Sequence, residues 1–236
     1  MKSLIKDWFD KIRALTKYRN TLLSSVVVSF VLLFINYHMK HIMKWFHYPR
    51  GYSLLVRFTL YGLIFIIIPF LTFPFIKDKE SFGLKIGNWK KWLPDLLIAY
   101  LVMLILVIIF GRTQSFMRTY PLFKKAKESW QIFAIYEGSH FIYMFGWEFL
   151  FRGYFLFSLR KETGDVAAVI IQMIPFAVLH AGKPELEAYG SIIAGFYLGI
   201  MALRGKSMIP AALLHFLVGF SMDVFAVLYS GSLRIF

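Results

Sequence analysis

The sequence predicts an all-α, polytopic membrane protein: a bundle of about six to eight transmembrane helices plus an amino-terminal amphipathic helix. Of its 236 residues, 58% are hydrophobic and 19% aromatic, whereas soluble domains are roughly 45–50% apolar. The mean hydropathy is +0.62, and apolar stretches long enough to cross a bilayer recur along the chain. Short basic clusters separate these stretches, as is typical of loops at a membrane surface.

The range 1–20 predicts a basic amphipathic helix that lies on the membrane surface. It carries six lysines and arginines, while its apolar residues recur at helical spacing. A long apolar run follows it and no small-residue cleavage site is evident, which argues against a cleavable signal peptide.

The apolar runs that follow predict six or seven spans. These lie at about 21–38, 56–76, 93–111, 129–158, 166–181, 188–203 and 208–229. The fourth run is longer than one crossing needs, so it predicts a tilted helix, a kink near Gly146 or an extension beyond the bilayer. Because no repeat or long linker interrupts the chain, we expect one membrane domain. Residues 21–128 supply its first transmembrane helices and residues 129–230 supply its polar core.

Composition excludes several classes of site and partner. The chain has no cysteine, which excludes disulfides, zinc–thiolate sites and a cysteine nucleophile. Its formal charge of +14 could indicate a nucleic-acid partner. However, the basic residues lie between apolar runs and form no separate basic domain, so we expect membrane lipid, and no nucleic acid, as the partner.

Four ionisable residues lie within the apolar segments of the carboxy-terminal half: Glu148, Arg152, His180 and His215. An ionisable side chain in hydrocarbon costs about 2.5–3.5 kcal/mol on insertion scales, so such residues are usually paired or functional. Four of them on three segments predict a shared site. Glutamate and histidine are also the side chains that bind metal and transfer protons near neutral pH.

Each residue also has a simpler interpretation when taken alone. Glu148 and Arg152 are four residues apart, which suits a buried ion pair that only fixes helix packing. A histidine at the end of a span, such as His180, is often merely interfacial or hydrogen-bonded. Asp223 follows His215 by eight residues and could orient its imidazole indirectly, or face the headgroups instead.

The order of these motifs is more specific than any one of them. Glu-x-x-x-Arg-Gly begins at Glu148, Phe-x-x-x-His ends at His180, and His215 lies in a late apolar segment. This order resembles the CPBP family of intramembrane metalloproteases (CAAX proteases and bacteriocin-processing enzymes, also called Abi), which includes the type II CAAX prenyl endopeptidases. The resemblance covers about residues 130–223 and extends to the runs FLFRGYFLF and GFYLGIMALRGKSMIPAALLH.

The resemblance implies a hydrolase: a metal-dependent intramembrane endopeptidase whose core helices enclose a polar cavity. The expected cofactor is a divalent metal, with zinc as the expected ion, near Glu148, His180 and His215. Metal-bound water has a pKa of around 7 and can attack a peptide carbonyl. Glu148 would be the general base or a metal-site carboxylate, and Arg152 would hold that carboxylate or stabilise the oxyanion. The implied substrate is a peptide or protein, possibly lipidated, cut near the membrane surface.

Two positions depart from the family pattern. The first motif usually begins with paired glutamates, of which the first is usually assigned to water activation; here Trp147 stands in that place. The last motif usually has Asn or Asp four residues after its histidine, and here that position is Gly219.

Three acidic residues are candidate substitutes: Glu137, Glu187 and Asp223. Glu137 precedes Glu148 by three helical turns on nearly the same stripe, with His140 between them on a less favourable side. For each candidate, a role in a solvated loop or at the membrane interface is the alternative.

Two other functions are compatible with the same residues. A catalytically silent scaffold or partner-binding protein would keep the fold and part of the polar cluster. A small transporter could also use buried Glu, Arg and His as a relay, although transporters commonly show repeat symmetry that this sequence lacks. In each case we expect an integral membrane protein, most simply of a bacterial cytoplasmic membrane.

Overall fold

The computed structural model describes residues 5–7, 10, 19–75 and 82–231. Helices make up nearly all of these ranges, which contain no strand, and this confirms the predicted all-α bundle. The α-helices are α2 (Arg19–Ile42), α3 (Ser53–Leu71), α4 (Trp89–Phe110), α5 (Gln114–Thr119), α6 (Trp130–Glu148), α7 (Leu156–Thr163), α8 (Asp165–Val178), α9 (Glu185–Gly205) and α10 (Ile209–Tyr229). The other helical segments are η2 (Met43–Trp45), η3 (Phe73–Phe75), η4 (Lys124–Lys127) and the π-helix η5 (Phe149–Phe155).

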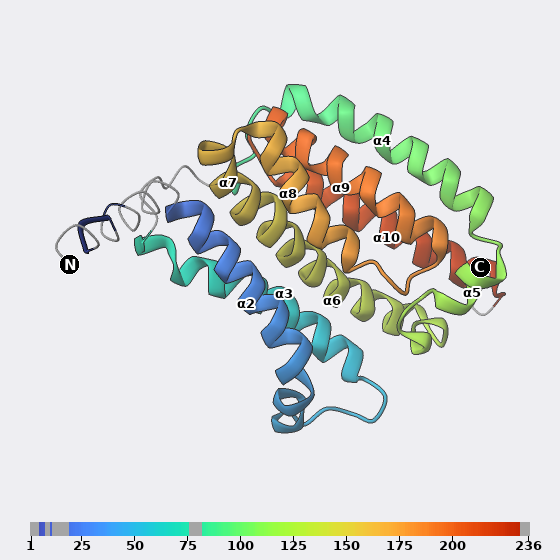
Figure 1. Cartoon of the computed structure of the whole chain (residues 1–236). Coiled ribbons are helices and arrows are strands. Elements are labelled where there is room, and N and C mark those ends of the chain that lie inside the picture. The colour runs from blue at the N-terminus through green and yellow to red at the C-terminus, as the bar shows by residue number, and fades with distance from the viewer. Residues whose placement is uncertain (1–4, 8–9, 11–18, 76–81, 232–236) are drawn as a thin grey trace.

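Helix α6 runs through the middle of the bundle (Figure 1). It packs against α3 on one side and against α10 on the other, while α8 pairs with α9 and α4 covers α9 and α10. Helix α6 therefore contacts helices from both halves of the chain, and α8 and α9 reach the same region through their contacts with η5.

Within the part of the chain that the structure describes, four helical segments are long and apolar enough to cross a membrane: Ser53–Phe75, Trp89–Phe110, Glu185–Gly205 and Ile209–Tyr229. Two shorter apolar helices, Arg19–Ile35 and Asp165–Val178, accompany them. The sequence predicted about six to eight transmembrane helices. Helix α4 exposes mostly apolar residues, as a lipid-facing helix does: Leu97, Ile98, Leu101, Val102, Ile105 and Ile109. The amphipathic helix predicted for residues 1–20 lies largely outside the described residues.

The fourth predicted span, 129–158, is three helical segments in line. Ser129 caps α6, since its hydroxyl accepts a hydrogen bond from the backbone N–H of Ile132 at 3.2 Å. The helix then widens into the π-helix η5 immediately after Glu148 and returns to α-helical form in α7. Such π segments occur frequently at functional sites. The predicted irregularity is therefore a change of helix type just beyond Gly146.

Two glycines bring the backbones of α3 and α6 into direct contact. A Cβ atom on Gly146 would lie 2.3 Å from the carbonyl oxygen of Gly62, and one on Gly62 would lie 2.3 Å from the carbonyl oxygen of Ile142. Both obstacles are backbone atoms, which cannot move aside as a side chain can. Close approach of α3 to α6 therefore requires glycine at both positions.

Gly146→Ala is expected to destabilise the bundle, whereas Gly138→Ala on the same helix is not. Overpacking costs about 1–3 kcal/mol, while a Cβ on Gly138 meets nothing within 4 Å. A glycine-to-alanine change in an open helical position stabilises by about 0.5–1 kcal/mol. The free energy of unfolding in detergent should therefore fall for Gly146→Ala and stay level or rise for Gly138→Ala. Equal values for the two variants would contradict the backbone contact.

Candidate active site

A buried ion pair lies at the junction of α6 and η5. Nη1 of Arg152 lies 2.8 Å from Oε1 of Glu148, and both side chains have no exposed surface. The guanidinium group of Arg152 also lies 3.9 Å from the ring centroid of Phe176 and 3.4 Å from the carbonyl oxygen of Gly195. These contacts hold the carboxylate of Glu148, which is one of the two roles expected for Arg152.

The imidazole of His215, on α10, binds the same carboxylate. Its Nδ1 lies 2.6 Å from Oε1 of Glu148, and a carboxylate beside Arg152 can only accept, so Nδ1–H is the donor. In the neutral ring this leaves a lone pair on Nε2. The side chain of His215 is 19% exposed although its partner is fully buried. The imidazole of His215 is therefore oriented by a buried charge pair and is itself partly exposed.

The second imidazole, His180, lies just beyond the end of α8 and is held in the same way. Its Nδ1 lies 2.8 Å from the carbonyl oxygen of Phe176, which can only accept a hydrogen bond. The rings of His180 and His215 are stacked with centroids 6.2 Å apart. Each imidazole thus uses Nδ1–H for its hydrogen bond. In the neutral form, Nε2 of each ring keeps a lone pair.

These contacts bring together all four residues singled out within apolar segments. Glu148 and Arg152 come from α6 and η5, His180 follows α8, and His215 comes from α10. The two imidazoles have the tautomer that metal-ligating histidines commonly show, in which the other ring nitrogen is bound to a carboxylate or a carbonyl. The donor set thus fits two imidazole ligands. Glu148 fits the outer position, because its Oε1 is already engaged by Arg152 and His215.

Trp147 fills space beside this cluster. Its side chain is 7% exposed, and its ring packs against Phe65 at 5.4 Å, Phe151 at 5.1 Å and His180 at 6.5 Å between centroids. The place where the family pattern has a glutamate is therefore part of the apolar core. Among the described residues, Glu148 is the acidic group that contacts Arg152 and His215.

A second titratable cluster, formed by Glu137, His140 and Asp223, lies farther along α6 and α10. One potential ligand atom from each lies within 4.8 Å of the others. Nδ1 of His140 is 3.3 Å from Oε2 of Glu137 and 3.6 Å from Oδ2 of Asp223. The hydroxyl of Tyr136 donates a hydrogen bond to Oδ2 of Asp223 at 2.9 Å. We call Glu137, His140 and Asp223 the α6–α10 cluster.

The sequence did not predict that His140 or Tyr136 belongs to a polar site. The relevant signal is Gly219, since a Cβ atom at that position would lie 2.9 Å from Cε1 of His140. The imidazole therefore occupies the space into which a side chain at position 219 would point. The imidazole of His140 on α6 thus packs against Gly219 on α10. This contact depends on how the two helices are aligned, so the sequence alone does not predict it.

Glu187, the remaining candidate substitute, has other partners. It accepts a hydrogen bond from the hydroxyl of Tyr120, and its Oε1 lies 3.5 Å from Nζ of Lys183. Burial and the neighbouring carboxylate of Glu187 hold the pKa of Tyr120 well above its ordinary value, so this hydroxyl stays a donor. These contacts tie the start of α9 to the segment after α5.

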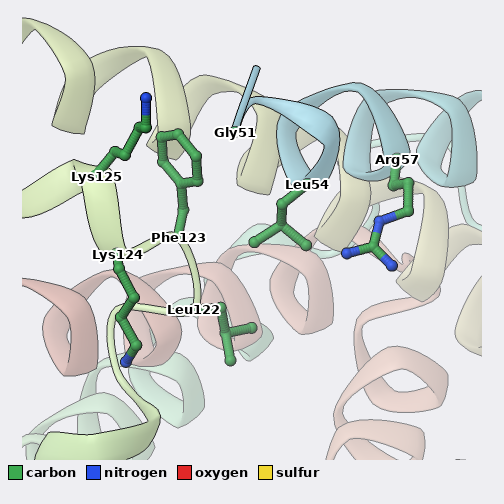
Figure 2. Close-up of a pocket in the computed structure, with 7 residues that line it drawn as sticks. All are labelled: Gly51, Leu54, Arg57, Leu122, Phe123, Lys124 and Lys125. Carbon is green, nitrogen blue, oxygen red and sulfur yellow. The ribbon is translucent and has the colours of Figure 1, made fainter. Parts of the chain in front are cut away.

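A basic pocket of about 390 Å³ lies between α3 and the segment around residues 122–125 (Figure 2). It is lined by Gly51, Leu54, Arg57, Leu122, Phe123, Lys124 and Lys125. Partial burial and the nearby Lys127 lower the pKa of Lys124. None of the lining residues belongs to either titratable cluster, so the pocket is a separate feature of this end of the bundle.

A comparison with known protein families finds a match to part of this chain. Residues 129–221 match the family described as type II CAAX prenyl endopeptidase Rce1-like, which confirms the predicted resemblance over the carboxy-terminal half. The matched segment contains α6 and η5, His180 and His215. No curated protein gives a significant match to the chain, and no solved structure does so.

Proposed function

We propose that the protein is an intramembrane endopeptidase, because residues 129–221 match the Rce1-like type II CAAX prenyl endopeptidase family. Its reaction is hydrolysis of a peptide bond near the membrane surface. The observation that carries the proposal is the hydrogen bond of 2.6 Å between Nδ1 of His215 and Oε1 of Glu148. A carboxylate behind an imidazole fixes its tautomer and stabilises the imidazolium that forms when it takes a proton.

The chain supplies a complete set of acid–base groups at this site. Nε2 of His215 accepts a proton from the attacking water, and Glu148 stabilises the resulting charge. Arg152 keeps Glu148 ionised and in place, so that the negative charge persists in an apolar environment. Water activation therefore needs no glutamate at position 147.

His180 supplies the second imidazole face of the site. Its Nδ1–H donates to the carbonyl of Phe176, which leaves Nε2 without this hydrogen bond, and its ring stacks on that of His215. A zinc ion would be held by His180 and His215 and would itself supply the activated water, whose pKa it would lower to around 7; His215 would then act as a ligand in place of its role as proton acceptor. The substrate class that follows from the family is a peptide or protein, with or without a lipid group, that approaches from the membrane.

The second candidate function is a catalytically silent scaffold, and Trp147 favours it. Its indole packs 6.5 Å from His180 between ring centroids and fills the position of a family glutamate with apolar surface. A scaffold would keep the Glu148–Arg152 ion pair for helix packing and would hydrolyse nothing.

A cleavage assay separates the two functions. The purified chain in lipid vesicles is expected to cleave members of a peptide panel with and without a carboxy-terminal prenyl group, and His180→Ala is expected to lose at least 100-fold in rate. The matched control is His47→Ala, because His47 is exposed and lies outside the site. Absence of cleavage across the panel, or equal rates for His180→Ala and the control, would favour the scaffold.

A further inference from the structure

The α6–α10 cluster contains two buried carboxyl groups that are paired with no lysine or arginine among the described residues. Glu137 is 6% exposed, His140 4% and Asp223 1%. Among the described residues, no lysine or arginine forms an ion pair with either carboxylate, whose only such contacts are those with His140. Glu148, by contrast, forms an ion pair with Arg152. Two buried carboxylates without a cation are strongly unfavourable.

Two oxygen atoms in the cluster lack hydrogen-bond donors. Oε1 of Glu137 and Oδ1 of Asp223 are fully buried and have no hydrogen-bond partner among the described residues. When both groups are ionised they cannot satisfy each other, because both are then acceptors only. A positively charged ligand between them would satisfy both atoms at once.

The surroundings hold the cluster in a geometry that suits such a ligand. The ring of Tyr136 stacks on His140 with centroids 5.6 Å apart and an interplanar angle of 11°, and Phe58 and Phe216 pack around the same imidazole at 5.8 and 5.9 Å. The hydroxyl of Tyr136 orients Asp223. Hydrogen-bonded outer partners of this kind fix metal ligands and tune their affinity.

We infer that Glu137, His140 and Asp223 bind a divalent metal ion that links α6 to α10, at a site separate from the Glu148–His215 pair. One imidazole and two carboxylates suit a first-row divalent ion such as zinc or manganese. The ion neutralises the two carboxylates and satisfies both unpartnered oxygens. The inference does not depend on peptide cleavage, since it concerns a different set of side chains.

The test measures metal binding in a background that lacks both imidazoles of the candidate active site. The full chain carrying His180→Ala and His215→Ala is purified with an affinity tag that contains no histidine, stripped with a chelator, and dialysed against Zn²⁺ or Mn²⁺. We expect one bound ion per chain and a rise in Tm. Adding Glu137→Gln or Asp223→Asn is expected to weaken binding at least 100-fold, and Tyr136→Phe about 10-fold. Glu187→Gln is the control and should leave the affinity unchanged.

The measurements also define what would overturn the inference. If the background binds neither ion and its Tm does not respond to either, the two carboxyl groups share a proton instead. If Glu137→Gln and Asp223→Asn bind as tightly as the background, the ion lies elsewhere. The Tm of the background with and without metal decides the matter even if a cluster variant fails to fold.

Discussion

His215→Asn is expected to lower the rate of peptide hydrolysis by about 10²–10⁴-fold, the range that a positioned acid–base group contributes. The asparagine amide can still donate to Oε1 of Glu148, where Nδ1 of His215 now lies at 2.6 Å. It has no counterpart of Nε2, so the variant removes the proton-accepting atom and keeps the link between α10 and α6. The measurement is kcat at saturating peptide in lipid vesicles, together with thermal unfolding.

The matched control for this variant is His47→Asn, which makes the same change at an exposed residue outside the site. The control should retain the wild-type rate, and both variants should unfold near the wild-type temperature. A full rate for His215→Asn would remove His215 from the proposed mechanism and leave the ion pair with a purely structural role.

Glu148→Ala is expected to destabilise the protein by about 3–5 kcal/mol, because it leaves Arg152 charged and unpaired in a fully buried position. Apolar replacement of the whole pair should behave differently. The double variant Glu148→Leu with Arg152→Met should regain most of the lost stability, since well-packed apolar side chains often replace buried pairs at little cost. It should still lack activity, because His215 loses the carboxylate that orients it.

This prediction is checked by the free energy of unfolding of Glu148→Leu, of Arg152→Met and of the double variant, combined in a double-mutant cycle. A coupling energy near zero would show that Glu148 and Arg152 do not stabilise each other. Recovered stability together with recovered hydrolysis would show that the pair is dispensable for chemistry.

The helical fold and the first cluster could be predicted from the chain alone. Apolar runs of sufficient length specify the helices, and the spacing of four residues between Glu148 and Arg152 specifies their contact. Rare ionisable residues in apolar segments also predicted that His180 and His215 would lie near that pair. These signals are local or compositional, so they need no knowledge of how the helices are aligned.

The α6–α10 cluster could not be predicted in the same way, because it depends on the alignment of two helices far apart in the chain. His140 lies off the helical face that Glu137 and Glu148 share, yet its Nδ1 lies 3.6 Å from Oδ2 of Asp223. In the sequence, Gly219 stands where the family pattern has Asn or Asp. The packing of α10 on α6 shows that the imidazole of His140 occupies the space beside it. The π-helical turn after Glu148 was likewise invisible, since no residue in FLFRGYF requires it.

That wide turn gives the chain between Glu148 and α7 a place where one residue more or less can be accommodated. Removing one residue from Phe149–Phe155 would let the segment relax to an ordinary α-helix. The residues of α7 would then keep their orientation about the helix axis, whereas the same deletion within α6 would rotate every later residue by about 100°. Chimeras that join this protein to its relatives can therefore differ in length by one residue at this turn, and must preserve the residue count within α6.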